Sequence, residues 1–230
     1  MEGEETRFAS AGGTRGGSER LATDGQAGAA AVSEDRARDG ATNATRVVSF
    51  DDEPLILVDA ADRELGFLDK AAAHRGHGTL HRAFSLFIFD EAGRVLLQQR
   101  APGKRLWPGY WSNACCSHPR RGESLEHAIH RRLREELALV CELEFLFKFE
   151  YQAQYDADGA EHELCWVYAG RTADAPQVNV NEIAAMRYVA PDVLDTEIMQ
   201  APERFTPWFK LEWARIRREH PGLFVRDFTN

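Results

Sequence analysis

The sequence predicts an α+β domain in which helices flank a mixed β-sheet. Three observations carry this prediction. Several short apolar runs end at turn residues, as strands joined by hairpins do. The segment 125–137 has the apolar spacing of an amphipathic helix. Strands and helices do not alternate as regular β-α-β units, so the pattern favours a mixed sheet over a fully parallel one.

The first half of this domain predicts three strands. The apolar run 55–58 is followed by Asp-rich turn residues and is interpreted as a strand and a turn. Segments 84–89 and 94–99 are further strand candidates. The short turn at 90–93 between them predicts a β-hairpin.

The second half predicts two helices with strands between them. Within 125–137, Leu, Ile and Ala recur at helical spacing with charged residues between them, which gives about four turns. The remaining segments are, in order, strands at 143–155 and 162–172 around a turn at 156–159, a strand and a turn within 181–194, and a helix at 206–220.

The N-terminal part of the chain differs in composition from the rest. Residues 1–46 consist mainly of small, polar and charged residues, so they cannot offset their ordering entropy by burial. We therefore expect a disordered tail at 1–46 and one folded domain at 47–230. The tail contains acidic residues and no apolar run, which argues against a secretory signal and a transit peptide.

The overall charge limits the classes of partner. A formal net charge of −9 disfavours nucleic acid, because phosphate backbones require a basic surface. No apolar stretch is long enough for a membrane span. A cytoplasmic protein without membrane attachment is expected. An anionic small molecule stays possible if a few cations converge.

The four cysteines do not predict a disulfide framework. The chain shows no secretory signal, and the adjacent pair Cys115 and Cys116 would form a strained bridge. The Cys-x2–4-Cys spacing of structural zinc is absent. Buried thiols are the default interpretation, and the neighbouring motif "WSNACCSHP" must decide whether one of them is reactive.

The predicted helix at 125–137 is rich in charge. Taken alone, it is interpreted as a solvated face with ion pairs Arg131–Glu135 and Arg132–Glu136. The segment also resembles a degenerate Nudix box, G-x5-E-x7-R-E-U-x-E-E-x-G-U. The matching residues are Glu123, Arg131, Leu133, Glu135, Glu136 and Leu139, and the departures are Ser117, Arg132 and Ala138, which replace Gly, Glu and Gly.

These departures bear on activity. Nudix hydrolases use the box carboxylates to hold catalytic Mg2+, and Arg132 places a cation at one acidic position. The motifs "LHRAFSLFIFD", "RAPGKRLWPGYWSNACCSHP", "EHELCWVY" and "FTPWF" resemble, in order, the type I isopentenyl-diphosphate isomerases. The resemblance extends from about residue 53 to about residue 220. It implies a Nudix-like mixed sheet flanked by helices. The activity it implies is a 1,3-allylic proton shift between isopentenyl and dimethylallyl diphosphate, in isoprenoid biosynthesis.

The resemblance also implies a metal site. In a strand, the spacing Glu161-x-Glu163 directs both carboxylates to one face. Together with imidazoles, such a mixed nitrogen and oxygen set suits Mn2+, Mg2+ or Zn2+. The implied ligands are His74, His81, His118, Glu161 and Glu163.

The implied chemistry is acid–base. Cys116 matches the family's catalytic cysteine, while Cys115 is interpreted as packing. A thiol with an ordinary pKa of about 8.5 is mostly protonated at neutral pH, so Cys116 can give or take a proton. On the opposite face of the substrate we expect Glu163, hydrogen-bonded through Tyr151. Trp208 resembles the family tryptophan that lies against the carbocation.

The diphosphate needs opposing charge. Lys70, Arg100 and Lys104 match the family's cationic positions, and Glu136 is implied to hold a Mg2+ that accompanies the substrate. The expected partner is this small molecule alone, and a monomer is expected. Two other functions are possible: a Nudix hydrolase, which Arg132 at an acidic position of the box opposes, and a non-catalytic metal or prenyl-diphosphate binding protein, which the presence of both acid–base residues opposes.

Overall fold

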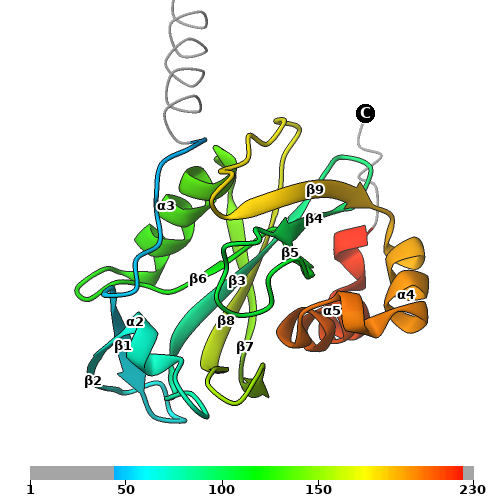
Figure 1. Cartoon of the computed structure of the whole chain (residues 1–230). Coiled ribbons are helices and arrows are strands. Elements are labelled where there is room, and N and C mark those ends of the chain that lie inside the picture. The colour runs from blue at the N-terminus through cyan, green and yellow to red at the C-terminus, as the bar shows by residue number, and fades with distance from the viewer. Residues whose placement is uncertain (1–43, 225–230) are drawn as a thin grey trace, which may run out of the picture. The chain divides into compact units, whose positions relative to one another are not determined.

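The sheet is organised around one central strand. The computed structural model describes residues 44–224, and within them a nine-stranded mixed sheet lies between two layers of helices (Figure 1). The strands are β1 (Pro54–Val58), β2 (Glu64–Asp69), β3 (His81–Phe89), β4 (Val95–Arg100), β5 (Trp111–Asn113), β6 (Cys115–Ser117), β7 (Leu143–Gln154), β8 (Ala160–Arg171) and β9 (Ile183–Val189). Strand β3 pairs with β1, β4 and β6 in the antiparallel sense and with β8 in the parallel sense.

Helices cover both faces of this sheet. Helix α3 lies on one face, and α4 and α5 lie on the other (Figure 1). The helical elements are α2 (Lys70–Ala73), α3 (Leu125–Leu137), α4 (Pro191–Gln200), η1 (Pro202–Arg204), α5 (Pro207–Glu219) and η2 (Pro221–Phe224). No helix within residues 44–224 has both the length and the apolarity needed to cross a membrane. The expected α+β class with helices flanking a mixed sheet is confirmed.

Strand β3 shows why the sequence forms a two-sided core. Phe87 and Phe89 pack against the α5 side, whereas Leu86 and Ile88 pack against the α3 side. Successive side chains of a strand point to opposite faces, so a continuous apolar run supplies both cores. Because of the same alternation, polar residues of β3 also point to the α5 side.

Helix α3 begins and ends as the sequence predicts. The Ser124 side chain accepts a hydrogen bond from the backbone N–H of His127 at 3.2 Å, which caps the N-terminus. The helix ends at Ala138, whose φ of 52° is left-handed. Glycine is favoured at such an end, and the Nudix box has Gly at this position. Ala138 therefore keeps the box geometry at some conformational cost.

Two expectations about connections need correction. The turn between β3 and β4 is present, with Gly93 N donating to Asp90 O at 3.0 Å, but the two strands share only the pair Phe89–Val95. They then separate, because β3 pairs with β8 while β4 pairs with β9. Only a turn was expected after β9, whereas α4 forms there. Proline at its first position suits a helix start, and Leu194 is buried.

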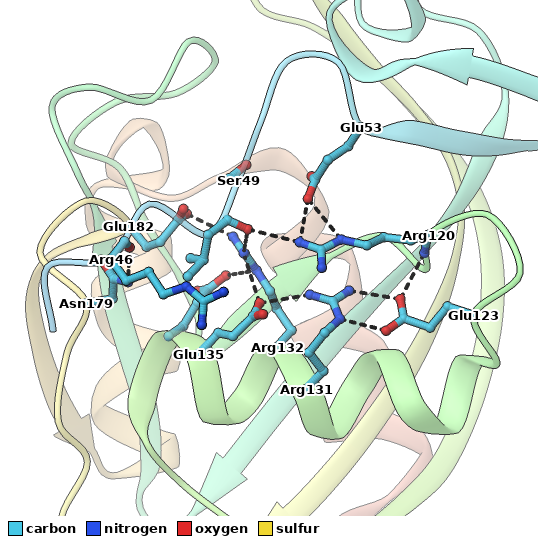
Figure 2. Close-up of polar contacts among 12 residues, drawn as sticks. Arg46, Ser49, Glu53, Arg120, Glu123, Arg131, Arg132, Glu135, Asn179 and Glu182 are labelled. Carbon is cyan, nitrogen blue, oxygen red and sulfur yellow. Dashed lines mark hydrogen bonds and ion pairs between the residues drawn. The ribbon is translucent and has the colours of Figure 1, made fainter. Parts of the chain in front are cut away.

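The segment 44–50 packs against the domain. Asn179 Nδ2 donates to Arg46 O at 2.7 Å (Figure 2). Asn181 Nδ2 donates to Thr45 O at 2.9 Å, and Arg132 Nη1 donates to Val48 O at 2.6 Å. Residues 44–46 had been assigned to the tail and instead make ordered contacts with the domain. The expectation of disorder for residues 1–43 lies outside the described part of the chain.

These contacts predict different effects for two N-terminal deletions. Removing residues 1–43 is expected to leave the free energy of unfolding unchanged. Removing residues 1–49 is expected to lower it by about 1.5–3 kcal/mol, because the buried Arg132 guanidinium loses its carbonyl acceptor. Urea denaturation of both proteins measures the difference. Equal stability of the two would show that the segment 44–50 contributes nothing.

Candidate active site

Three histidines and two glutamates form a cluster at the ends of several elements. His74 caps α2, His81 begins β3, and His118 directly follows β6, while the two glutamates lie in β8. One possible ligand atom from each residue lies within 4.8 Å of all the others, and all five residues form this group. They are His74, His81, His118, Glu161 and Glu163, the set that the sequence implied.

Strand register explains how distant residues meet. In the parallel pairing of β3 with β8, His81 lies opposite Glu163. Glu161 and Glu163 are two residues apart in β8 and therefore share a face, as expected. His162 between them points away and pairs with Glu150 of β7 at 3.2 Å. The strand thus separates a buried cluster from a surface ion pair.

The orientation of the imidazoles fits a divalent cation. His74 Nδ1 is 2.7 Å from Lys70 O, and His81 Nδ1 is 2.7 Å from Thr79 O. A carbonyl oxygen can only accept, so each Nδ1 carries the proton and each Nε2 presents a lone pair to the cluster. His81 Nε2 is buried and has no hydrogen-bond partner among residues 44–224. An ion in the cluster would satisfy it.

Electrostatics favours the forms in which these groups ligate metals. Burial, followed by the charge of His74, lowers the pKa of His81 to about 3. Burial also lowers the pKa of His118 well below its ordinary value. Against the effect of burial, His74 lowers the pKa of Glu161 to about 2. Neutral His81 and His118 and an ionised Glu161 are ligand forms that a divalent ion requires, whereas Glu161 raises the pKa of His74 against the effect of burial.

The pKa of Glu163, the second carboxylate of the cluster, shifts in the opposite direction to that of Glu161. Burial and the neighbouring Glu161 charge raise the pKa of Glu163 well above its ordinary value. Tyr151 Oη donates a 2.7 Å hydrogen bond to Glu163 Oε2, across the antiparallel pair β7–β8. Glu163 is therefore a carboxyl group that can exist in either protonation state, as an acid–base group must.

Cys115 and Cys116 are adjacent in β6, and their side chains point in opposite directions. Cys115 is fully buried in the core under α3, whereas the Cys116 side chain faces an inner cavity of about 60 Å³. Tyr151, Glu163 and Trp208 line the same cavity. All four residues proposed for catalysis from the sequence are thus brought together, and the interpretation of Cys115 as a packing residue is supported by its burial.

The surroundings of Cys116 keep it protonated. Burial and the nearby Glu212 charge raise the pKa of the Cys116 thiol to about 12. Its Sγ donates to Asn113 Oδ1 at 2.9 Å. The Asn113 amide nitrogen is occupied by the carbonyls of Leu86 and Cys115, which fixes the oxygen toward the sulfur. Sequence analysis missed Asn113, although it lies within the motif that contains Cys116.

Trp208 lies at the start of α5, beside the reactive groups. Its ring centroid is 6.2 Å from that of Tyr151 and 5.3 Å from that of Trp107, and Arg100 Cζ is 5.4 Å from it. Its indole nitrogen is buried and has no hydrogen-bond partner in the described part of the chain. The structure therefore places Trp208 both in the core and at the cavity wall.

The predicted cations converge. Lys70, Arg100 and Lys104 line both the inner cavity and an outer cavity of about 320 Å³ that adjoins it. Burial and the charge of Lys104 lower the pKa of Lys70 to about 8. Sequence analysis did not assign Arg105, which lines the outer cavity, or Arg132, which lines the inner one.

Helix α3, which carries most of the Nudix-box residues, does not have the fully solvated charged face that its sequence suggests. Arg132 and Glu136 are each 2% exposed, and Arg132 Nε is 2.7 Å from Glu136 Oε1. Arg132 Nη2 is also 3.1 Å from Glu182 Oε2 (Figure 2). The pair Arg131–Glu135, at 2.8 Å, is present as expected. These residues are buried because the segment 44–50 and the 179–182 loop cover this side of α3.

Apart from His81, which belongs to the cluster of possible metal ligands, Glu136 is the one predicted site residue that lines neither cavity. Its carboxylate lies behind Arg132, with which it is paired. Burial raises the pKa of Glu136 in spite of Arg132. Its role in holding a substrate-bound Mg2+ stays a prediction.

The fold and this site define a Nudix protein. The NUDIX domain family model matches residues 79–209. Two solved structures share the fold. DR0079 from Deinococcus radiodurans has a TM-score of 0.58 and 22% identity, over 73% of this chain and 99% of that one. A MutT protein from Methanosarcina mazei Go1 has a TM-score of 0.52 and 17% identity, over 61% of this chain and 94% of that one.

The sequence relatives narrow this class. An isopentenyl-diphosphate Delta-isomerase 1 of Photorhabdus laumondii is 45% identical over 170 residues, which cover 73% of this chain and 97% of that protein. An isopentenyl-diphosphate Delta-isomerase of Pectobacterium atrosepticum is 45% identical over 162 residues, 70% and 90% of the two chains. The chain belongs to the isopentenyl-diphosphate Delta-isomerase family.

Proposed function

We propose that the protein interconverts isopentenyl diphosphate and dimethylallyl diphosphate by moving a proton across an allylic system, a step in isoprenoid biosynthesis. The observation that carries this proposal is the shared inner cavity. It presents a thiol, Cys116, and a carboxyl with its phenol, Glu163 and Tyr151, to the same small space. A cationic outer cavity adjoins it and suits a diphosphate.

The reaction needs an acid and a base at two different carbons. An unactivated alkene is a weak base, so protonation of its terminal carbon gives a tertiary carbocation and requires a well-placed acid. Cys116 and Glu163 would add the proton at one carbon and remove one from another. Their raised pKa values suit either group as the proton donor, and the other group has to be in its ionised form to accept the proton that leaves. Tyr151 orients Glu163 through the 2.7 Å hydrogen bond.

The walls of the cavity supply binding and charge stabilisation. The Trp208 ring would lie against the developing cation, and an aromatic face contributes about 0.5–2 kcal/mol to such a charge. Lys70, Arg100 and Lys104 would bind the diphosphate, and Glu136 would hold its Mg2+. A narrow inner cavity also excludes water that would capture the cation.

The His and Glu cluster would hold a divalent ion, either Mn2+, Mg2+ or Zn2+. When bound, such an ion supplies positive charge that fixes the carboxylates and keeps a bound carboxyl group acidic. The residues themselves position Glu163 beside the cavity whatever the ion, because β8 pairs with both β3 and β7.

Metal binding predicts a measurable stabilisation. Mn2+ or Zn2+ added to metal-stripped protein, at about 100 times its dissociation constant, is expected to raise stability by about 2.7 kcal/mol. This corresponds to a melting-temperature increase of roughly 5–10 °C. Glu161→Gln, which keeps the shape and removes a ligand charge, should abolish most of the increase. Glu150→Gln on β7 is the control, and an equal increase in the Glu161→Gln protein would contradict the site.

The activity is tested by proton NMR in D2O. Purified protein is incubated with isopentenyl diphosphate and Mg2+, and the olefinic signals are followed. Deuterated dimethylallyl diphosphate without released phosphate is the expected product. Released phosphate would instead indicate a hydrolase, and an unchanged substrate with metal bound would indicate a binding protein.

A further inference from the structure

Helix α5 places a carboxyl group inside the core next to the proposed site. Glu212 is 0% exposed and lies four residues after Trp208, so both side chains face the sheet. Within residues 44–224, no Lys, Arg or His forms an ion pair with it, and its Oε2 has no hydrogen-bond partner. Its helix neighbours Phe209, Trp213 and Ile216 are apolar core residues. A carboxyl group without a counter-ion is costly in such surroundings.

A chain of polar contacts connects this carboxyl to Cys116. Cys165 Sγ is 3.5 Å from Glu212 Oε1 and 3.4 Å from Ser85 Oγ. Ser85 Oγ is 3.5 Å from Cys116 Sγ. Ser85 is paired with Cys116 in the β3–β6 register and projects from the face of β3 that packs under α5. The proposed proton-carrying sulfur therefore has Asn113 on one side and the Ser85–Cys165–Glu212 group on the other.

We propose that Glu212 is a positioning residue for Cys116, acting through Cys165 and Ser85 to hold the sulfur toward the inner cavity. This inference rests on the proposed function, because it assigns Glu212 to the proton transfer of Cys116. Ser85 is suited to the connection, since a hydroxyl both donates and accepts. Its hydroxyl can accept from the Cys165 thiol, which contacts the carboxyl group, while it donates toward the Cys116 sulfur. The role requires no bond to form or break at Glu212.

The protonation state of Glu212 gives this role a signature. Burial raises the pKa of Glu212 to about 8, while Ser85 and Cys165 oppose the increase. The titratable groups facing it are Cys165 and Glu163 on β8 and Cys116 on β6. Below pH 8 the neutral carboxyl group can donate a hydrogen bond. Above pH 8 it becomes a carboxylate, which can only accept and which repels negative charge near the sulfur.

The test compares pH profiles of kcat for the wild-type protein and Glu212→Gln. The wild-type kcat is expected to fall with a midpoint near pH 8, by about tenfold per pH unit above it. Gln keeps the shape and a donor group but does not ionise, so this fall should disappear while kcat at pH 7 stays within about threefold. Glu219→Gln, on the same helix and exposed, should retain the fall. Persistence of the fall in Glu212→Gln would overturn the proposal.

Two further variants separate positioning from folding. Glu212→Leu and Ser85→Ala should each lower kcat at pH 7 by roughly 10–100-fold with KM within about twofold. The double variant should lose no more than the larger single loss, because both act through one contact. Unchanged kcat in a folded Ser85→Ala protein would overturn the inference. If Glu212→Leu does not fold, the Gln profile and Ser85→Ala decide. If the wild-type protein does not isomerise at all, the proposed function fails first and separately.

Discussion

Replacing Cys116 by alanine is expected to lower kcat by about 10²–10⁴-fold, the range that a positioned general acid or base contributes. Cys116 is the only thiol that lines the inner cavity among the described residues, and alanine has no proton to transfer in its place. KM for isopentenyl diphosphate should change little, because the cationic residues of the outer cavity stay in place. Steady-state kinetics by NMR measures both constants.

The adjacent cysteine is the matched control. Cys115→Ala removes a thiol one residue away, but its side chain packs under α3 and is 0% exposed. Its kcat should stay within about threefold of the wild-type value, with a modest loss of stability of about 1 kcal/mol from the small cavity left behind. Equal loss of activity in both variants, with both proteins folded, would remove the assignment of Cys116.

The elements that carry the site could be predicted because their signals are local. The apolar alternation of β3 and the helical spacing of α3 appear directly in the sequence. The five clustered metal-ligand candidates were implied by motifs that stand at fixed places in the chain, and strand alternation alone explains why Glu161 and Glu163 share a face. Short strands such as β5 and β6 were missed because three residues show no period.

The charged groups were harder to interpret, because burial depends on segments far away in the sequence. Arg132 has the surroundings of a surface residue in the sequence, but it is buried once residues 44–50 lie over α3. Glu212 lies in a charged amphipathic helix and looks like one more solvent-facing glutamate. Only the packing of α5 on the sheet places it beside Cys165. Helical periodicity identifies a face, but it does not tell which charged residue lies at the edge of that face.

Arg132→Glu restores the acidic residue of the Nudix box and is expected to unfold the protein rather than to create a hydrolase. The Arg132 guanidinium lies between Glu136 and Glu182 and donates to Val48 O. A glutamate there would bring three carboxylates together in a buried site and would remove the cation that pairs with both Glu136 and Glu182. Removing one partner of a buried ion pair costs about 3–5 kcal/mol, and reversing its charge should cost more.

The pH dependence of this loss has a definite sign. In the wild-type protein, Arg132 overcomes burial and lowers the pKa of Glu182 to about 2, so this carboxylate stabilises the fold above its ordinary pKa of 4.5, and the contribution is lost as pH falls toward 2. In Arg132→Glu the crowded carboxylates would have raised pKa values, and stability should fall as pH rises above 4.5. The destabilisation should therefore be larger at pH 8 than at pH 5.

Denaturation at the two pH values, together with a phosphate-release assay, measures the outcome. Arg134→Glu on the exposed side of α3 is the matched control and should be nearly as stable as wild type at both pH values, since an exposed charge near a helix end changes stability by only about 0.3–1 kcal/mol. A folded Arg132→Glu protein that releases phosphate would show that the box needs only this one residue to hydrolyse diphosphates. Unfolding without phosphate release would show that the fold requires Arg132. The isomerase site would then depend on the same cation that prevents the box from assembling its acidic metal site.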